Sequence, residues 1–294
     1  MATMDFVGRA GKSPREAAQW SRRQVLMTDL RSIRGRAYPR WRGLFREKSW
    51  VLFEILLPFL GTSAFVFVYR ALQAPVEYVG FAVLGGAMTA FWLNVIWMMA
   101  NQLYWEKTQG NLELYFASPM HFMSILFGMA IGGIFMSSTR AVVVITAASL
   151  LYGVQFSVDQ WAVLIVVFML TLAALYGLGM VLASLFLVWG REAWHMGQLL
   201  TEPVYFVSGL NFPVARLGFL GAVSVALIPL ATGLDAMRQL AFAGAAFPVG
   251  TPSPLVEIGI LVLMSIVSIA AARWMLLAME RRARRDGRLS VRWQ

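Results

Sequence analysis

Cysteine is absent from this 294-residue sequence, and histidine occurs only twice, as His121 and His195. Without cysteine there are no disulfide bonds, thiol catalysis or cysteine-metal sites. A metal site needs several converging ligands, so two isolated histidines do not indicate one. Charged residues make up only 14% of the chain, against about 25% in soluble domains. With 59% hydrophobic residues and a mean hydropathy of +0.66, the composition indicates a membrane protein.

A phosphate-binding loop is also missing. Such a loop has the pattern G-x-x-x-x-G-K-[ST], in which the lysine holds phosphates and the hydroxyl holds magnesium. Gly11, Lys12 and Ser13 match its end, but Phe6 stands where the first glycine belongs and no apolar strand precedes it. Beyond residue 48, Lys107 is the only lysine. We therefore expect a chain that is not an enzyme, with no catalytic residue and no cofactor of its own.

Long apolar runs dominate the rest of the sequence. A helix needs about 20 mostly apolar residues to cross a membrane core of ~30 Å. Five runs reach that length, at residues 50–69, 78–100, 122–152, 161–188 and 255–279. A shorter run at 196–210 is interrupted by Glu202 and Pro203. We predict an all-α membrane protein with six transmembrane helices.

Residues 218–247 are apolar but are interrupted by polar, glycine and proline residues. Pro229, Gly233, Asp235 and Arg238 divide this region into halves that are too short to span a membrane. Irregular backbone at membrane depth is tolerated where protein covers it. The region is therefore predicted to form a re-entrant helical hairpin or a buried cap.

The net charge of +10 comes mostly from arginines at the two ends of the chain. Cytoplasmic flanks of membrane proteins carry such an excess, so the distribution favours a membrane surface over nucleic acid. Two cytoplasmic ends require an even number of spans, which six satisfies. We expect a cytoplasmic arm at 1–48, a transmembrane domain at 49–279 and a basic tail at 280–294. Because no apolar stretch occurs near the start, we expect no cleaved signal peptide.

The basic arm has helical features. Residues 13–16 (SPRE) form a capping box with proline at the first helical position. Trp20, Leu26, Leu30 and Ile33 then recur at roughly helical spacing among arginines. This pattern is typical of an amphipathic helix on an anionic membrane surface. A disordered basic arm is the alternative.

One polar segment, YWEKTQGNLELYFASPM at 104–120, separates two of the most apolar runs. Its Leu112, Tyr115 and Phe116 have helical spacing and form an apolar face. Gly110 permits a bend, and Pro119 ends the short helix before the next span. A short amphipathic helix joined to two spans would transmit force into the membrane. An ordinary polar loop would show the same features.

Two patterns resemble those of type-2 ABC exporter permeases. The first is E-x-x-x-G-x-L-E-x-x-x-x-x-P, filled by Glu106, Gly110, Leu112, Glu113 and Pro119. The second combines SGLNFP at 208–213 with IPLATGLDAMR at 228–238, which includes Pro213, Pro229, Asp235 and Arg238. It is similar to the family's turn and re-entrant helix between the fifth and sixth spans.

The resemblance implies a mechanism and partners. The segment 102–119 would be the coupling helix that seats in a separate ATPase subunit, which supplies ATP and magnesium. The arm would be the connecting helix. Two permeases, expected to be identical, and two ATPases would form the transporter in the inner membrane. A cavity between the permeases would open alternately to each side, and the second and fifth spans would lie near it.

The ionisable residues inside the expected spans include Glu54, Arg140 and Glu202. Such residues usually face the protein interior. Arg140 and Glu202 each lie about eleven residues from a span end, ~16 Å deep, so we predict that they pair. Binding of cargo by one of them is the alternative. Trp92, Asn94 and Trp97 are candidates for lining the pathway, although tryptophan is also common at membrane interfaces.

The segment GNLELYFASP is more similar to the drug-resistance and sodium-efflux branch of the family than to the polysaccharide branch. A hydrophobic drug or lipid-like cargo is therefore expected, with a polysaccharide as the alternative. An intramembrane scaffold without transport activity is a competing interpretation. A secondary transporter is another, but such transporters often contain internal repeats with paired broken helices, and this chain shows one broken region and no clear repeat.

Overall fold

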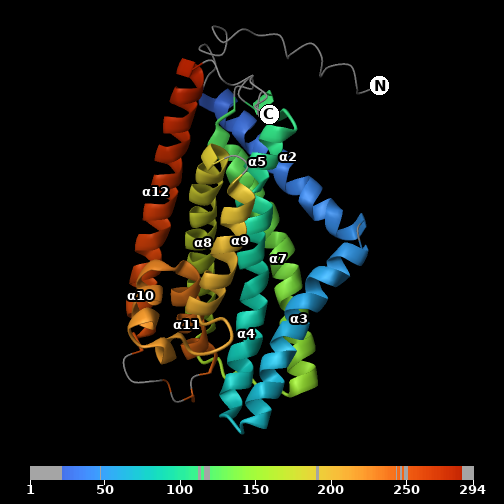
Figure 1. Ribbon diagram of the computed structural model, residues 1–294, viewed down its shortest axis with the longest axis vertical. Helices are drawn as coiled ribbons and strands as arrows, with labels where there is room; N and C mark the ends of the chain where they lie inside the picture. Colours follow the sequence, from blue (N-terminus) through green and yellow to red (C-terminus); the bar gives the residue numbers. More distant parts are fainter. Residues whose placement is uncertain are drawn as a thin grey trace.

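The chain forms a bundle of long helices (Figure 1). A computed structural model describes residues 22–46, 48–111, 114–115, 120–189, 192–242, 244–245, 247 and 251–286. In these ranges the only β pairing is an isolated bridge between Ser157 and Phe242. The prediction of an all-α membrane protein is confirmed.

Five helical segments are long and apolar enough to span a membrane. The second of them runs without interruption through a π-helix, η2. The five segments are α3 (Lys48–Ala71), α4–η2–α5 (Val76–Leu93, Asn94–Ala100 and Gln102–Thr108), α7 (Phe122–Tyr152), α8 (Trp161–Trp189) and α12 (Pro254–Asp286).

The sixth predicted span is not settled by length. Helix α9 (Ala193–Val207) has 15 residues, so it is about 22 Å long and shorter than a membrane core. After the short η4 (Val214–Leu217), helices α10 (Phe219–Leu227) and α11 (Pro229–Ala241) meet at an angle of 103°. By length this bent pair is either one broken span or a re-entrant hairpin, and the count of six stays a prediction.

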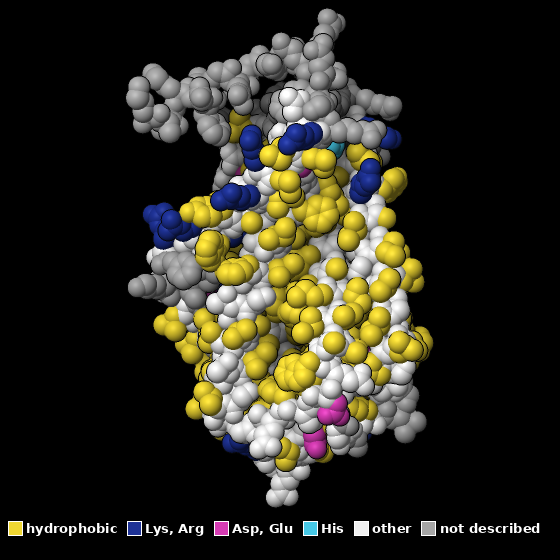
Figure 2. All heavy atoms as spheres, turned by 180° about the vertical axis from the view of Figure 1, so that it is seen from behind, with side chains coloured by type: hydrophobic (Ala, Val, Ile, Leu, Met, Phe, Trp, Pro, Cys, Tyr) yellow, Lys and Arg dark blue, Asp and Glu magenta, His cyan; other side chains and the backbone are white. Residues whose placement is uncertain are grey.

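The α4–η2–α5 helix forms the centre of the bundle. In its apolar window 89% of the residues are buried, compared with 17% in α3 and in α12. A helix that is apolar on all sides is suited to such a central place. The outer helices present hydrophobic side chains over the middle of the surface, and most of the visible lysine and arginine side chains gather toward one end (Figure 2).

Helix α2 (Arg22–Arg46) packs against α7 through glycine. A Cβ atom added to Gly128 would lie 2.7 Å from the Ile33 carbonyl oxygen, and one added to Gly132 would lie 3.2 Å from the Ala37 Cα atom. The two glycines are four residues apart and share one face of α7, so they form a groove for α2. A helix in the arm is confirmed for these residues, while the capping box at 13–16 lies outside the described ranges.

A second glycine contact joins α4 to the turn after α9. A Cβ atom added to Gly85 would lie 1.5 Å from the Leu210 carbonyl oxygen, so Gly85→Ala must displace backbone.

We expect Gly85→Ala to lower the midpoint of thermal unfolding in detergent, at a cost of about 1–3 kcal/mol for overpacking. In Gly259→Ala, the matched control on α12, the new Cβ meets nothing within 4 Å. Because alanine favours helix, that control should not lower the midpoint. Equal midpoints for the two variants would contradict this account.

Candidate functional site

A partly open cavity of about 620 Å³ lies along the central helix. We call it the main cavity. Its walls come from α3, α4, η2, α5, α7 and α9. Most of the lining side chains are apolar; the residues are Phe53, Glu54, Leu57, Pro58, Ala90, Leu93, Asn94, Trp97, Met98, Gln102, Trp105, Arg140 and Gln198.

An ion pair forms part of this wall. Arg140 on α7 contacts the carboxylate of Glu54 on α3, and the two side chains are 5% and 16% exposed. The predicted pair between Arg140 and Glu202 is therefore wrong, because Glu202 is exposed on α9. Depth along the expected spans favoured Glu202, but the faces that α3 and α7 turn toward one another select Glu54.

The π-helix η2 supplies another wall. Asn94, Trp97 and Met98 all line the main cavity. The Tyr176 hydroxyl donates a hydrogen bond to Asn94 Oδ1 at 3.1 Å, whereas Asn94 Nδ2 is buried and has no hydrogen-bond partner among the described residues. A buried donor without a partner is unfavourable unless something binds it. The asparagine amide is thus available to an acceptor in the cavity.

Trp92 does not line this cavity. It is 1% exposed, and its indole nitrogen donates a hydrogen bond to the Thr201 carbonyl at 3.4 Å. Of the three residues that the sequence suggested for the pathway, Asn94 and Trp97 face a cavity and Trp92 packs in the core. Spacing along one helix did not distinguish them, because rotation of that helix against its neighbours decides which side chains are covered.

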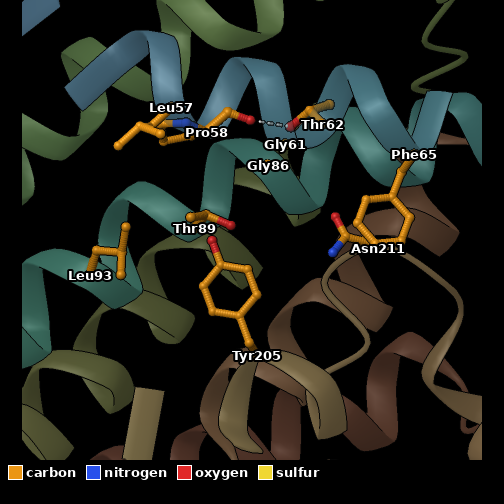
Figure 3. A pocket seen from close by; sticks show the side chains of 10 residues that line it. All are labelled: Leu57, Pro58, Gly61, Thr62, Phe65, Gly86, Thr89, Leu93, Tyr205 and Asn211. Carbon is orange, nitrogen blue, oxygen red and sulfur yellow. Dashed lines mark hydrogen bonds between the residues drawn. The ribbon is translucent and has the colours of Figure 1, made fainter. Parts of the chain in front are cut away.

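A minor cavity of about 210 Å³ continues the same groove between α3, α4 and α9 (Figure 3). It shares Leu57, Pro58 and Leu93 with the main cavity. The Tyr205 side chain extends from α9 toward Thr89 on α4, while Asn211 lies near Phe65 (Figure 3). The two cavities therefore follow one another along α3 and α4 and meet at three apolar side chains.

Glu106 on α5 is the centre of a polar cluster beside the main cavity. Only 4% of the residue is exposed. Its Oε1 accepts hydrogen bonds from Arg36 Nη1 at 3.0 Å and Gln102 Nε2 at 2.9 Å. Its Oε2 accepts from Asn111 Nδ2 at 2.9 Å and the Tyr115 hydroxyl at 2.8 Å. This carboxylate binds groups within the chain and joins α2 to the polar segment.

The rest of that segment is only partly described. Gly110 has φ = +78°, a left-handed conformation that favours glycine, and the helix α5 ends just before it. Leu112, Glu113 and Pro119 lie outside the described residues, so their assignment to a coupling helix stays a prediction.

Arg40 on α2 connects α2 to the cavity wall. Its Nη1 donates a hydrogen bond to the Met129 carbonyl on α7 at 2.8 Å, and its Nη2 donates to the Met98 carbonyl on η2. Burial lowers the pKa of the Arg40 guanidinium to about 10, so it remains charged at neutral pH. Sequence reasoning missed Arg40, although its spacing of four residues from Arg36 places both on one helix face.

Asp29 fixes the other part of α2. Its carboxylate accepts a hydrogen bond from the His121 backbone N–H at 3.0 Å and lies 2.8 Å from His121 Nδ1, where α7 begins. Burial opposes ionisation of Asp29, but the hydrogen bonds from His121 outweigh it and lower the pKa of this carboxyl. The contact is therefore retained at neutral pH and lost only in acid, below the ordinary aspartate pKa.

The two halves of the downstream pattern meet through Arg238 on α11. Its Nη1 donates to the carbonyls of Gly209 and Phe212 at 2.7 and 2.9 Å. Its Nη2 donates to the carbonyls of Leu210 and Phe81 at 2.8 and 3.0 Å. The guanidinium thus holds the SGLNFP turn against α4.

The prolines of this pattern lie at helix starts. Pro213 precedes η4, and Pro229 is the first residue of α11. Proline suits these positions because the first N–H groups of a helix have no partner within it.

A family model described as "ABC-2 type transporter" matches residues 39–242, which is more than half of the chain. The chain belongs to the ABC-2 type transporter family. Comparison with curated proteins found no significant match. The matched range contains the residues of both cavities, Glu106 and Arg238.

As an ABC-2 permease, the chain is a membrane subunit of an ABC transporter, and the family works with an ABC ATPase. The described residues contain no group of three acidic, histidine or cysteine side chains that would hold a metal ion.

The Glu54–Arg140 pair gives a test of the cavity wall. Glu54→Gln or Arg140→Gln leaves one charge in the membrane without its partner, which costs about 3 kcal/mol when the pair is buried. We expect each single variant to unfold at a lower temperature, and Glu54→Arg combined with Arg140→Glu to recover part of the loss. Glu202→Gln is the control; it should change stability by less than about 0.5 kcal/mol, as exposed substitutions do. Damage by Glu202→Gln equal to that by Glu54→Gln would refute this pairing.

The Glu106 cluster gives a second test. Glu106→Gln keeps the size of the side chain but removes the charge that Arg36 and three further donors share. Unpaired buried groups cost about 1–3 kcal/mol each, so α2 should detach more often from α5. Hydrogen exchange of the α2 amides should become faster, while exchange in α8 stays unchanged. Lys107→Gln, on the exposed neighbour, should leave α2 protected; equal exchange in both variants would mean that Glu106 does not hold α2.

Proposed function

We propose that this ABC-2 permease is the membrane subunit of an exporter that moves a hydrophobic small molecule or lipid-like cargo out of the cytoplasm or inner leaflet. The observation that carries the proposal is the main cavity, whose largely apolar wall includes a few polar groups. Ligand sites commonly have this composition, since apolar walls supply affinity and a few polar groups fix orientation.

The polar groups suggest the chemistry of the cargo. Asn94 offers a free N–H donor, and Gln102 and Gln198 add amides at the wall. Glu54 and Arg140 neutralise each other, so the wall has no net charge from this pair. An uncharged or amphipathic molecule with a hydrogen-bond acceptor fits better than a polysaccharide, which would need many polar partners.

The groove also supports a permease dimer. Phe53 and Leu57 line the main cavity and are 55% and 54% exposed, so the cavity opens at the side of the bundle. A second copy placed against α3 and α9 would close the groove and create an enclosed path between two permeases. Two ATPases would complete the transporter, with both ends of each permease in the cytoplasm of a cell whose inner membrane holds the complex.

A chain of contacts supports coupling to the ATPase. The polar segment around Glu106 is joined to α2 by Arg36, and α2 is joined to η2 by Arg40. Movement of the polar segment by an ATPase would therefore reach Met98 and the cavity wall. Leu112, Glu113 and Pro119 would complete the surface that the ATPase contacts. A scaffold without transport activity has no need for a cavity beside such a connection.

The central experiment is to co-purify the permease with the ATPase encoded beside it, reconstitute the complex in liposomes and measure ATP hydrolysis with candidate cargoes. Hydrophobic cargo should stimulate hydrolysis and leave the inner-leaflet side of the membrane. Failure of any ATPase to bind, or transport that persists after residues 106–119 are scrambled, would contradict the proposal.

A cavity-filling variant tests the site of binding. Leu57→Trp places a large ring where the two cavities meet, so cargo-stimulated hydrolysis should fall about tenfold, as expected when about 1.4 kcal/mol of binding is lost. Basal hydrolysis should not change. Leu263→Trp, at an exposed position of α12, is the matched control and should behave as the parent protein. Equal stimulation of the parent and Leu57→Trp would place cargo elsewhere.

A further inference from the structure

A second polar cluster lies where α11 meets the start of α12, at the end of the bundle opposite α5 (Figure 1). It contains two acidic residues, Asp235 on α11 and Glu257 on α12. Asp235 is 2% exposed and Glu257 is 0% exposed. Carboxyl groups are almost never buried so completely without a partner. Neither residue belongs to the cavities or to the cluster around Glu106.

Arg238 does not bind either acid by a hydrogen bond. Its two Nη atoms donate to four backbone carbonyls, which use all four of their N–H groups. Its Nε has no hydrogen-bond partner in the described part of the chain. The positive charge of Arg238 is near Asp235 and acts on it through space. This one charge offsets one carboxylate and leaves the second without compensation.

The two carboxyl groups face the same contact between α11 and α12. Gln239 lies one helical turn after Asp235 on α11, and its Nε2 donates to Glu257 Oε2 at 3.1 Å, so Glu257 lies against the α11 face that carries Asp235. Asp235 Oδ2 and Glu257 Oε1 are buried, and no donor among the described residues reaches either oxygen. Ionised carboxylates accept hydrogen bonds only. A proton on one of the two carboxyl groups would supply the missing donor between them.

We propose that Asp235 and Glu257 form a proton-binding site that holds one proton while α11 and α12 are in contact. With that proton bound, the pair carries a single negative charge, which Arg238 balances. Loss of the proton would place two carboxylates side by side in a buried setting, and their repulsion would separate α11 from α12. The site would make the packing of this end of the bundle sensitive to pH.

The surroundings contain few other groups that would titrate. Helices α8 and α10 carry no Asp, Glu, Lys, Arg or His in their sequences, and the only such residue of α4, Glu77, is half-buried in its first turn. Tyr69 on α3 interacts electrostatically with Arg238. The proton therefore belongs to the Asp235–Glu257 pair as a unit, rather than to either residue alone.

Infrared spectroscopy of the purified permease tests for the proton directly. A protonated carboxyl group has a C=O stretching band distinct from that of a carboxylate. We expect wild-type permease at neutral pH to show such a band, and expect both Asp235→Asn and Glu257→Gln to lose it. In each variant the amide N–H replaces the shared proton and the remaining acid is ionised. Glu77→Gln is the control and should retain the band. A wild-type protein without the band, or a band that survives both substitutions, would overturn the proposal.

Thermal unfolding across pH gives a second measurement. The folded pair holds a proton that the unfolded chain releases at neutral pH, so stability should fall as pH rises through the folded titration. Asp235→Asn and Glu257→Gln should reduce this dependence by up to one proton per permease, whereas Glu77→Gln should not. If the stability of the wild type instead follows sodium concentration at fixed pH, the site binds a cation and the proton assignment is wrong. If a variant does not fold, the wild-type infrared band still decides.

Discussion

Buried arginines that bind backbone carbonyls and carboxylates determine how this bundle is assembled. Neither lipid nor water is available at such depth to satisfy a guanidinium, so each must find partners within the chain. Arg238 binds four carbonyls and thereby holds the turn at 209–212 against α4. Arg40 binds carbonyls of α7 and η2, and Arg140 contacts Glu54. These contacts join helices that are far apart in sequence and fix their relative rotation.

The central helix is the element that these contacts share. Arg238 binds the carbonyl of Phe81 on this helix, and Arg40 binds the carbonyl of Met98. Between these points, hydrogen bonds of the Trp92 and Asn94 side chains position the middle of the helix. Its π-helical turn lines the main cavity and is followed by α5, which carries Glu106. Such turns often occur at functional sites, because the widened backbone presents side chains and carbonyls that a regular helix would not. The wall of the main cavity and the attachment of α2 therefore depend on the same few residues.

The two ends of the bundle carry different polar clusters. At one end, Glu106 joins α2 to α5 through charge-assisted and neutral hydrogen bonds. At the other, Asp235 and Glu257 are buried where α11 meets α12, close to the charge of Arg238. The cavities lie between the clusters, so a transporter of this construction would have separate sites at which an ATPase and the proton concentration affect one groove. This division follows from the proposals above and suits a protein that must respond at both membrane faces.

The sequence by itself determined the membrane class, the long apolar runs, the broken region at 218–247 and the missing ATP-binding loop. These properties are local, and composition and periodicity report them directly. Only the tertiary structure decided that Arg140 meets Glu54 and not Glu202, that Glu106 is buried among groups of its own chain, and that Trp97 but not Trp92 faces a cavity. These outcomes depend on how each helix is rotated against its neighbours, and a hydrophobic run that is apolar on every side carries no signal of that rotation.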